Sequence, residues 1–372
     1  MPSLPCVLGA APDYYEKLGI SSQTIDLWEN GLRTHPEEHS AWEWWYFDTH
    51  LENGAKLVIV FLTKDYASPN TGLRPRLLIQ LDTPGGRKWD VLKDFRPQDF
   101  KASKERCDVS FTTPEGFVNF FRDDGTLENI EIVAQIQDLD VTVKLAGKAP
   151  AWRPKTGQIF YGQDENQYFA WLPSIPYGDV KATYRISGED KVSVSGNGYH
   201  DHNWGNVPLF NVVNHWYWGR GQVGPYTFIS ADIVHERAYD DKAITVFMLS
   251  RDGKIVADDG ERVTFTMENS NFDAATRRPV ADIIRFEHKD GDVRYVLEYI
   301  RAETILRSYH VNTLSGLKWL LAKLVGYDGC FHRFSGKLKL TKYENGRLTE
   351  EFEEDALWEL MWFGKVYDKP MC

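Results

Sequence analysis

The sequence predicts an all-β fold made of two antiparallel β-domains and a few short helices. Runs of β-branched and aromatic residues, such as "AKLVIVFLTKDY" at 55–66, recur along the chain between turn sequences. The segments that link these runs are too short for the crossover helices that parallel strands need, so the strands should pair antiparallel. Phe, Trp and Tyr make up 14% of the residues, which is typical of a β-rich core or an aromatic-lined cavity.

Both halves of the chain repeat this succession of strands and tight turns. In the first half, strands are expected in "RPRLLIQLDTPGGRKW", "CDVSFTTPEGFVNFF", "IEIVAQIQDLDVTVKLAG" and "DVKATYRISGEDKVSVSGNG". In the second half, "RDGK", "KDGD" and "ENGR" predict hairpins, because Asp-Gly and Asn-Gly suit two-residue turns. The polar segment 149–167, rich in Gly and Pro, is a linker or a long loop. We therefore expect an N-terminal domain at 1–190 and a C-terminal domain at 191–372.

Two short helices interrupt the strand pattern. One is expected in "APDYYEKLG" near the N-terminus. The other is expected near 315–325, where four leucines form an apolar face and Gly326 suits a C-terminal stop.

The bulk composition is that of a soluble globular protein, with 42% hydrophobic and 26% charged residues. A net charge of −11 argues against nucleic acid or an anionic membrane surface as a partner. No apolar run approaches the roughly 20 residues of a transmembrane helix, and the N-terminus lacks the basic region of a signal peptide. The four cysteines have no metal-binding or redox spacing, which indicates reduced thiols. We expect a cytoplasmic monomer or weak homodimer without stable membrane insertion.

The first polar motif is "HSAWEWWYFDTHL" at 39–51. In a strand, alternation places Trp44 and Tyr46 on one face together with Asp48, and Glu43 on the other. A carboxylate among bulky aromatic rings is desolvated, which raises its pKa and makes Glu43 a candidate acid. The alternative is that Glu43 pairs with an arginine or caps backbone amides.

The second motif is "GNGYHDHNWGN" at 196–206. Alternation groups Tyr199, Asp201 and Asn203 on one face, and places His200 and His202 on the other. The two histidines point the same way, as a metal pair would, but a zinc site needs at least three protein ligands. No HExxH or CxxC motif accompanies them, so no metal site is predicted. The opposite face could form an acid whose proton is tuned by hydrogen bonds. The alternative is a strand end whose polar residues satisfy loop backbone groups.

Tryptophans in two further motifs are candidate walls of a cavity. Trp216 and Trp218 share a face in "NHWYWGRGQVGPY", and Trp171 lies in "YFAWLPSIPYG". Such rings can stabilise a cation through the ring face, although core packing explains them equally well. The sequence contains no P-loop, no G-x-G-x-x-G after a strand and no G-x-S-x-G, so nucleotide and serine-hydrolase chemistry are not expected.

Taken in order, "WENGLRT", "HSAWEWWYFDTHLENG", "GYHDHNWGN" and "WYWGRGQVGPYTF" resemble the carotenoid 1,2-hydratase/AttH-like superfamily. This group includes kievitone-hydratase-like proteins and lipocalin-like, decalin-forming Diels–Alderases. The resemblance spans most of the chain, from Trp28 to "LWELMWFG". It implies two tandem lipocalin-like barrel or sandwich domains with a ligand pocket in or between them. In the hydratases an Asp in Y-x-D-x-N-x-G protonates a prenyl double bond, which here implies Asp201, Tyr199 and the upstream Trp171. The family's assisting His is replaced by Phe169.

These observations together predict a cofactor-independent enzyme that acts on a hydrophobic polyene, terpenoid or prenylated molecule by acid-promoted hydration, isomerisation or cyclisation. Asp201 is the expected general acid in an apolar pocket with a raised pKa, Tyr199 and Asn203 orient it, and Glu43 is a second carboxylate candidate. The expected substrate-binding residues are Trp171, Trp216, Trp218, Trp44, Tyr46, His200, His202 and Phe169. Two alternatives remain: a pericyclase, which mainly holds a flexible polyene folded, and a non-catalytic lipocalin-like binding protein.

Overall fold

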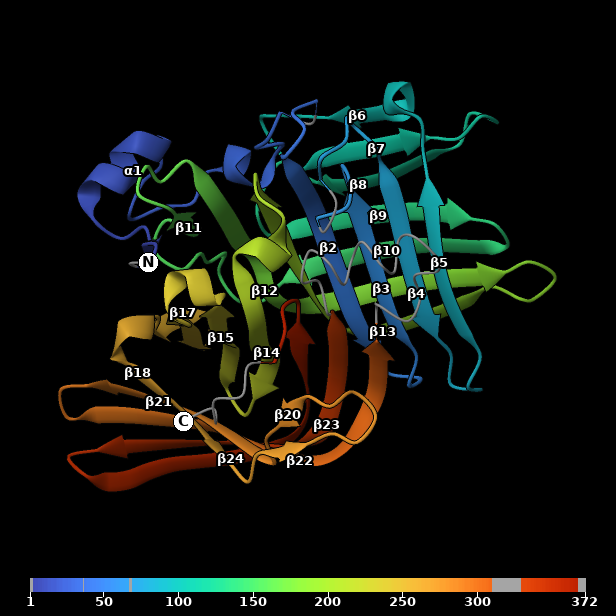
Figure 1. Cartoon of the computed structure of the whole chain (residues 1–372). Helices are drawn as coiled ribbons and strands as arrows, with labels where there is room; N and C mark the ends of the chain where they lie inside the picture. The colour runs from blue at the N-terminus through green and yellow to red at the C-terminus, as the bar shows by residue number, and fades with distance from the viewer. Residues whose placement is uncertain (1–2, 36, 67–68, 310–328, 367–372) are drawn as a thin grey trace. The chain divides into compact units, whose positions relative to one another are not determined.

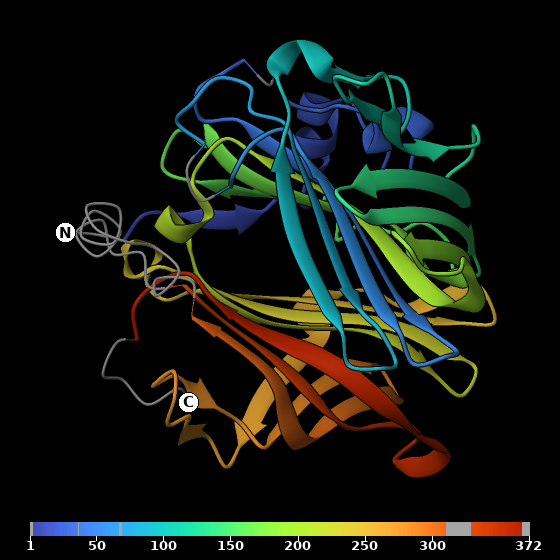
Figure 2. The ribbon, with the colours of Figure 1, turned by 90° about the vertical axis from the view of Figure 1, so that its right-hand side faces the viewer.

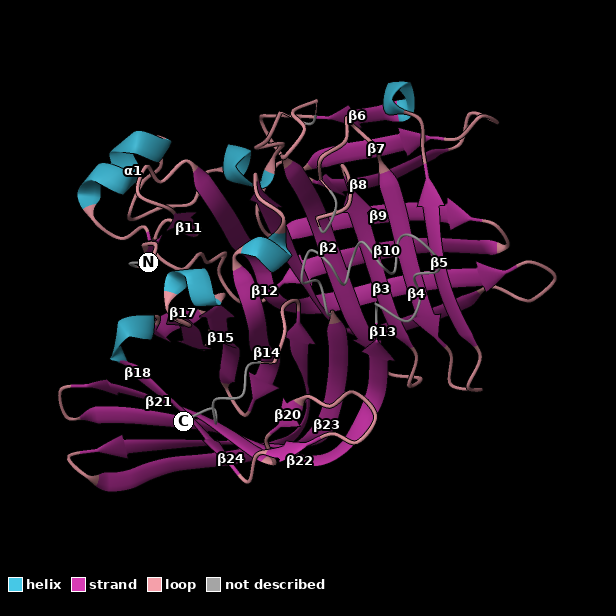
Figure 3. Ribbon diagram, viewed as in Figure 1, coloured by secondary structure: helices cyan, strands magenta, loops and turns pink. Residues whose placement is uncertain are grey.

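The computed structural model describes residues 3–35, 37–66, 69–309 and 329–366. Contacts divide the chain into two compact units. The N-terminal unit comprises Val7–Pro208, and the C-terminal unit comprises Leu209–Cys372 together with Met1–Cys6. Strands make up most of each unit (Figure 3), and the all-β prediction is confirmed.

The N-terminal unit contains a 13-stranded sheet with the order β5-β4-β3-β2-β13-β12-β10-β9-β8-β7-β6. In addition, β11 pairs with β12, and β1 pairs with β11. Its elements are β1 (Cys6–Leu8), α1 (Pro12–Leu18), η1 (Leu27–Asn30), β2 (Trp42–Leu51), β3 (Lys56–Leu62), β4 (Arg76–Asp82), β5 (Lys88–Asp94), η2 (Pro97–Asp99), β6 (Phe100–Ala102), β7 (Asp108–Thr112), β8 (Val118–Asp123), β9 (Asn129–Ile136), β10 (Leu139–Gly147), β11 (Gln158–Tyr161), β12 (Gln167–Ile186) and β13 (Val192–Gly205). Within this unit the sheet curls over, so that β6–β10 run across β2–β5 (Figures 1 and 2). A large apolar core fills the space between these two parts.

The C-terminal unit contains a nine-stranded sheet with the order β17-β16-β15-β14-β24-β23-β22-β21-β18, and a small ribbon of β19 and β20. Its elements are η3 (Leu209–Asn211), β14 (Val213–Val223), β15 (Tyr226–His235), η4 (Arg237–Tyr239), β16 (Ala243–Arg251), β17 (Lys254–Ala257), η5 (Gly260–Arg262), β18 (Val263–Glu268), β19 (Asn271–Phe272), β20 (Pro279–Val280), β21 (Ile283–Asp290), β22 (Val293–Tyr309), β23 (Cys330–Glu344) and β24 (Arg347–Trp362). The strands of this sheet surround an apolar core of their own.

The turn sequences act as predicted. "RDGK", "KDGD" and "ENGR" connect β16 to β17, β21 to β22 and β23 to β24. In the last of these, Asn345 and Gly346 both have positive φ, at 50° and 75°, as a two-residue hairpin turn requires. The helix expected in "APDYYEKLG" is α1, which ends at Gly19 in the left-handed conformation. The helix expected near 315–325 lies outside the described residues.

The boundary between the units falls at Pro208/Leu209, after β13 rather than before it at 190/191. The reason is pairing, because β13 lies between β12 and β2 and belongs to the first sheet. The polar segment 149–167 is therefore not a linker between the units. It leads into β11, which pairs with β12.

Two glycines that open the second polar motif let β13 approach β2 closely. A Cβ on Gly198 would lie 2.8 Å from the carbonyl oxygen of Asp48 and 2.6 Å from a methyl of Val180. A Cβ on Gly196 would collide with the carbonyl oxygen of His50. The glycines thus fix the distance between the two strands that carry the polar motifs.

Candidate active site

The register of β2 against β13 sorts the predicted residues onto two faces of the N-terminal sheet. Asp201 pairs with Tyr46, Asn203 with Trp44 and Tyr199 with Asp48, so these six side chains share one face. His202 pairs with Trp45 and His200 with Phe47, and these lie on the other face, toward the large core. We call the first the Asp201 face and the second the core face.

On the Asp201 face, one carboxylate collects three hydrogen bonds. Trp171 Nε1 donates to Asp201 Oδ2 at 2.7 Å and the Tyr199 hydroxyl donates to the same oxygen at 2.8 Å. Asn203 Nδ2 donates to Asp201 Oδ1 at 2.8 Å. Trp171 comes from β12, where it pairs with Asn203. All four side chains are buried, with Asp201 7% exposed. The structure therefore brings together the acid candidate and the three residues expected beside it.

The donors around Asp201 determine where a proton can sit. An indole nitrogen can only donate, and burial together with the neighbouring Asp201 charge raises the pKa of Tyr199 well above its ordinary value. Both hydrogens therefore point at Oδ2, and these contacts favour the carboxylate form. Oδ1 accepts from an amide that can turn to present its oxygen instead. A proton carried by Asp201 would therefore lie on Oδ1, with the Asn203 amide oxygen turned toward it.

Apolar and aromatic side chains surround this group on the Asp201 face. Val58, Val60 and Leu62 of β3 form a buried cluster, against which Trp44 and Tyr46 pack. Trp42 stacks on Trp44 with ring centroids 4.8 Å apart. The ring of Phe169, which is 4% exposed, lies 6.0 Å from that of Trp42. Phe169, Trp44 and Tyr46 therefore lie on the same face as the acid, as substrate-binding residues would, although their contact with a substrate stays a prediction.

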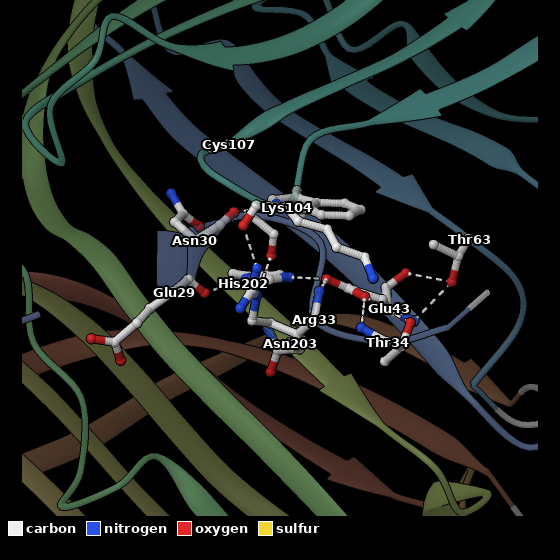
Figure 4. Close-up of polar contacts among 12 residues, drawn as sticks. Glu29, Asn30, Arg33, Thr34, Glu43, Thr63, Lys104, Cys107, His202 and Asn203 are labelled. Carbon is white, nitrogen blue, oxygen red and sulfur yellow. Dashed lines mark hydrogen bonds and ion pairs between the residues drawn. The ribbon is translucent and has the colours of Figure 1, made fainter. Parts of the chain in front are cut away.

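Glu43 lies on the core face, within a fully satisfied network (Figure 4). Its Oε1 accepts from His202 Nε2 at 2.7 Å and from the backbone N–H of Arg33 at 2.8 Å. Its Oε2 accepts from the backbone N–H of Thr34 at 2.8 Å and from the Thr34 hydroxyl at 2.7 Å. Glu43 and His202 are both 0% exposed. This is the capping arrangement that was the alternative to Glu43 as an acid, and the sheet separates Glu43 from Asp201.

The two histidines are held by protein groups on the core face. Burial lowers the pKa of His202, although the hydrogen bond with Glu43 opposes this. Its ring stacks on Trp45, with centroids 4.8 Å apart. His200 Nδ1 donates to the carbonyl oxygen of Tyr46 at 2.9 Å, and Nε2 lies 3.1 Å from Asn30 Nδ2. Burial lowers the pKa of His200 to about 3. Both rings are 0% exposed and lie opposite Asp201, so these contacts do not support the predicted substrate-binding role.

The remaining tryptophan candidates lie in the C-terminal unit. Trp216 and Trp218 are on β14 and alternate with the core residue Tyr217. The Trp216 ring packs edge-on against Phe363 at 4.7 Å. Their part in substrate binding stays a prediction.

The residue that sequence reasoning missed is Asp48, a second buried carboxylate on the Asp201 face. The sequence already indicates that Asp48 and Tyr46 share a face of a strand. The position of Asp48 next to Tyr199 depends on the pairing of β2 with β13. Across the described residues, no group of three or more His, Cys, Asp or Glu side chains is arranged to hold a metal ion. In the same part of the chain, no helix is long and apolar enough to cross a membrane.

The sequence also matches the profile of a known protein family. The profile of a family described as Diels-Alderase-like matches residues 127–326, more than half of the chain. A quinolone epoxide rearrangement protein of Emericella nidulans is 39% identical over 69 residues, which cover 18% of this chain and 18% of that protein. Hydroxyneurosporene dehydrogenase of Chlorobaculum tepidum is 42% identical over 55 residues, 13% of this chain and 14% of the relative. The match thus spans less than a fifth of either relative.

Solved structures show the same fold at low sequence identity. The crystal structure of CghA superimposes with a TM-score of 0.61 at 14% identity, covering 98% of this chain and all of CghA. Kievitone hydratase from Nectria haematococca gives a TM-score of 0.53 at 9% identity, covering 91% of this chain and 93% of the hydratase. These likenesses confirm the predicted lipocalin-like all-β fold.

Proposed function

The chain belongs to the Diels-Alderase-like family, and we propose that it is a cofactor-independent enzyme that transfers a proton to a hydrophobic small molecule. The reacting group would be an alkene, or an epoxide derived from one. The epoxide is included because a relative is named for epoxide rearrangement, and the alkene because a structural neighbour is a hydratase.

The observation that carries this proposal is the buried Asp201 carboxyl group with three fixed donors on an aromatic face. Three hydrogen bonds hold the carboxyl plane in one orientation, which is the preorganisation that proton transfer needs. Oδ1 gives the proton to an alkene carbon or an epoxide oxygen, and the resulting carboxylate is stabilised at Oδ2 by Trp171 and Tyr199. The cation formed on the substrate is then next to a carboxylate and to aromatic ring faces. Water addition, proton loss or ring closure completes the reaction.

The test is the isosteric variant Asp201→Asn, which keeps the shape of the site and removes the acid. Two probes represent the two reacting groups: citronellol for an isolated trisubstituted alkene and styrene oxide for an epoxide. We expect loss of turnover by at least about 10²-fold, the usual contribution of general acid–base catalysis. Asp90→Asn is the matched control, because Asp90 is exposed on β5, and β4, β3 and β2 lie between β5 and the strand of Asp201. Full turnover in Asp201→Asn would remove Asp201 as the acid.

A pericyclase is the second candidate, favoured by Phe169 at the position where the hydratases place an assisting histidine. A pericyclic ring closure needs no proton transfer and gains from a substrate held folded. For such an enzyme Asp201→Asn would be nearly neutral, whereas Trp44→Ala would open space on the Asp201 face and change rate and stereochemistry. A pure binding protein would instead release a co-purified ligand unchanged, and it would bury the polar Asp201 group at a cost in stability without using it.

A further inference from the structure

The Asp201 face carries two tyrosine–aspartate pairs side by side, one on each of two neighbouring strands. On β13 the Tyr199 hydroxyl donates to Asp201 at 2.8 Å, and on β2 the Tyr46 hydroxyl donates to Asp48 Oδ2 at 3.0 Å. The strands are antiparallel, so each aspartate lies directly across from the tyrosine of the other pair. The two phenol rings meet edge to face, with centroids 6.3 Å apart. The arrangement places Asp48 and Asp201 at diagonal positions of one ladder, whose backbones lie about 7–8 Å apart.

Asp48 is buried to the same degree as Asp201, at 8% against 7% exposure. Its neighbour across the ladder on β3 is Val58, a member of the apolar cluster that also includes Val60 and Leu62. Two residues further along β2, the next titratable group on this face is His50. Its partner in the register of β2 and β3 is Lys56. Beyond Val58, the residues in line with Asp48 are Gln80 on β4 and Asp90 on β5. An apolar residue would pack better than a carboxylate at this position, next to valines and to a second tyrosine–carboxylate pair. Burying the Asp48 carboxylate there costs free energy.

We propose that Asp48 is a second proton-transfer group of this site, acting on the same substrate as Asp201. The inference rests on the proposed function and narrows it. Two carboxyl groups several ångströms apart on one face suit a reaction that adds a proton at one atom and removes one from another. The substrate class is therefore an alkene that is isomerised or an epoxide that is rearranged to a carbonyl compound.

The epoxide case balances without any further reactant. One carboxyl group gives its proton to the epoxide oxygen, a C–O bond breaks, and its electron pair stays on oxygen. A hydrogen or carbon substituent migrates with its electron pair to the cationic carbon, which leaves a protonated carbonyl. The second group, as carboxylate, takes that proton. In alkene isomerisation one group protonates a carbon and the other takes a proton from the carbon next to the cation. The two carboxyl groups together hold the same number of protons before and after.

The first experiment needs no substrate. In protein labelled with ¹³C at the aspartate side-chain carboxyl carbon, the signals missing in Asp48→Asn and Asp201→Asn identify the two groups. Because a neighbouring negative charge disfavours ionisation, the titration of Asp201 should move to lower pH in Asp48→Asn and stay unchanged in Asp90→Asn. An Asp201 titration that is the same in wild type and Asp48→Asn would overturn the inference.

The second experiment measures conversion of styrene oxide to phenylacetaldehyde over a range of pH. We expect Asp48→Asn and Asp201→Asn each to lose at least tenfold in kcat and each to abolish one limb of the pH profile. Tyr46→Phe, which keeps the Asp48 carboxyl group but removes its donor, should shift the limb that Asp48→Asn abolishes. This variant also controls for a folding defect in Asp48→Asn.

The outcomes separate the inference from the proposed function. Loss in Asp201→Asn with an unchanged rate and pH profile in Asp48→Asn would overturn the role of Asp48 and leave the proposed function standing. If the wild-type protein converts neither styrene oxide nor citronellol, the result counts against the proposed function, and the carboxyl titration alone then decides whether the two groups are coupled.

Discussion

Removing the Glu43 side chain is expected to destabilise the N-terminal unit strongly. The buried Glu43 carboxylate accepts hydrogen bonds from two backbone N–H groups, from the Thr34 hydroxyl and from His202. In Glu43→Ala the hydroxyl can rotate, but the N–H groups of Arg33 and Thr34 and the ring N–H of His202 lose their acceptor together.

The magnitude follows from these three donors. Each buried donor left without a partner costs about 1–3 kcal/mol. Allowing for partial relaxation, we expect Glu43→Ala to lower the free energy of unfolding by about 3–5 kcal/mol. Glu43→Gln keeps one acceptor oxygen but turns an NH₂ toward a donor, so we expect a loss of about 1–3 kcal/mol.

The assay is urea unfolding followed by tryptophan fluorescence, since Trp45 stacks on His202 and reports on this network. Wild type, Glu43→Gln and Glu43→Ala should rank in that order of stability. A Glu43→Ala variant within about 1 kcal/mol of wild type would refute the reasoning, because it would mean that the three donors find other partners.

Three further predictions follow from the same strands. Gly198→Ala should cost about 1–3 kcal/mol in unfolding free energy and reduce turnover, because its Cβ would push β13 away from the Asp48 carbonyl. Melting temperature and activity should fall together, whereas Gly85→Ala, whose Cβ would lie in open space, should leave both unchanged. The pKa of His200 is lowered to about 3 in the folded protein, so the unfolded state binds its proton first as the pH falls below about 6.5, and stability is lost from there downward. Acidification from pH 7.5 to 5.5 should therefore destabilise His200→Gln less than wild type, by roughly 1 kcal/mol in urea titrations, and an equal loss would contradict this. Trp171→Phe keeps an aromatic side chain and removes one donor to Asp201, so kcat should fall by roughly tenfold, as for loss of a hydrogen bond of about 1.5 kcal/mol, with KM little changed.

The sequence predicts much of this site because strand alternation is local. Tyr199, Asp201 and Asn203 fall on one face wherever β13 is placed, and the hairpins follow from their Asp-Gly and Asn-Gly turns. The contact of Trp171 with Asp201 is different, since it requires the register of β12 against β13. That register shifts between Leu172 and Gly178, and no local pattern reveals the shift.

The roles of the histidines and Glu43 depend on long-range pairing. Glu43 and His202 are 159 residues apart and meet only because β2 lies beside β13. Alternation indicates that His200 and His202 point the same way, but it does not say whether that direction is a pocket or a core. The predicted domain boundary at 190/191 differs from the observed division for the same reason. The composition of the sequence marks the loop at 149–167, whereas the division between the two units follows the strand partners of β13.

The central claim is that Asp201 gives a proton to the substrate, and solvent deuterium tests it most directly. Citronellol incubated with the protein in D₂O should yield product carrying one deuterium at the carbon that was protonated, and Asp201→Asn should give none above the rate without protein. Product formed by the wild-type protein without deuterium at carbon, or deuterium incorporated equally by Asp201→Asn, would contradict the account.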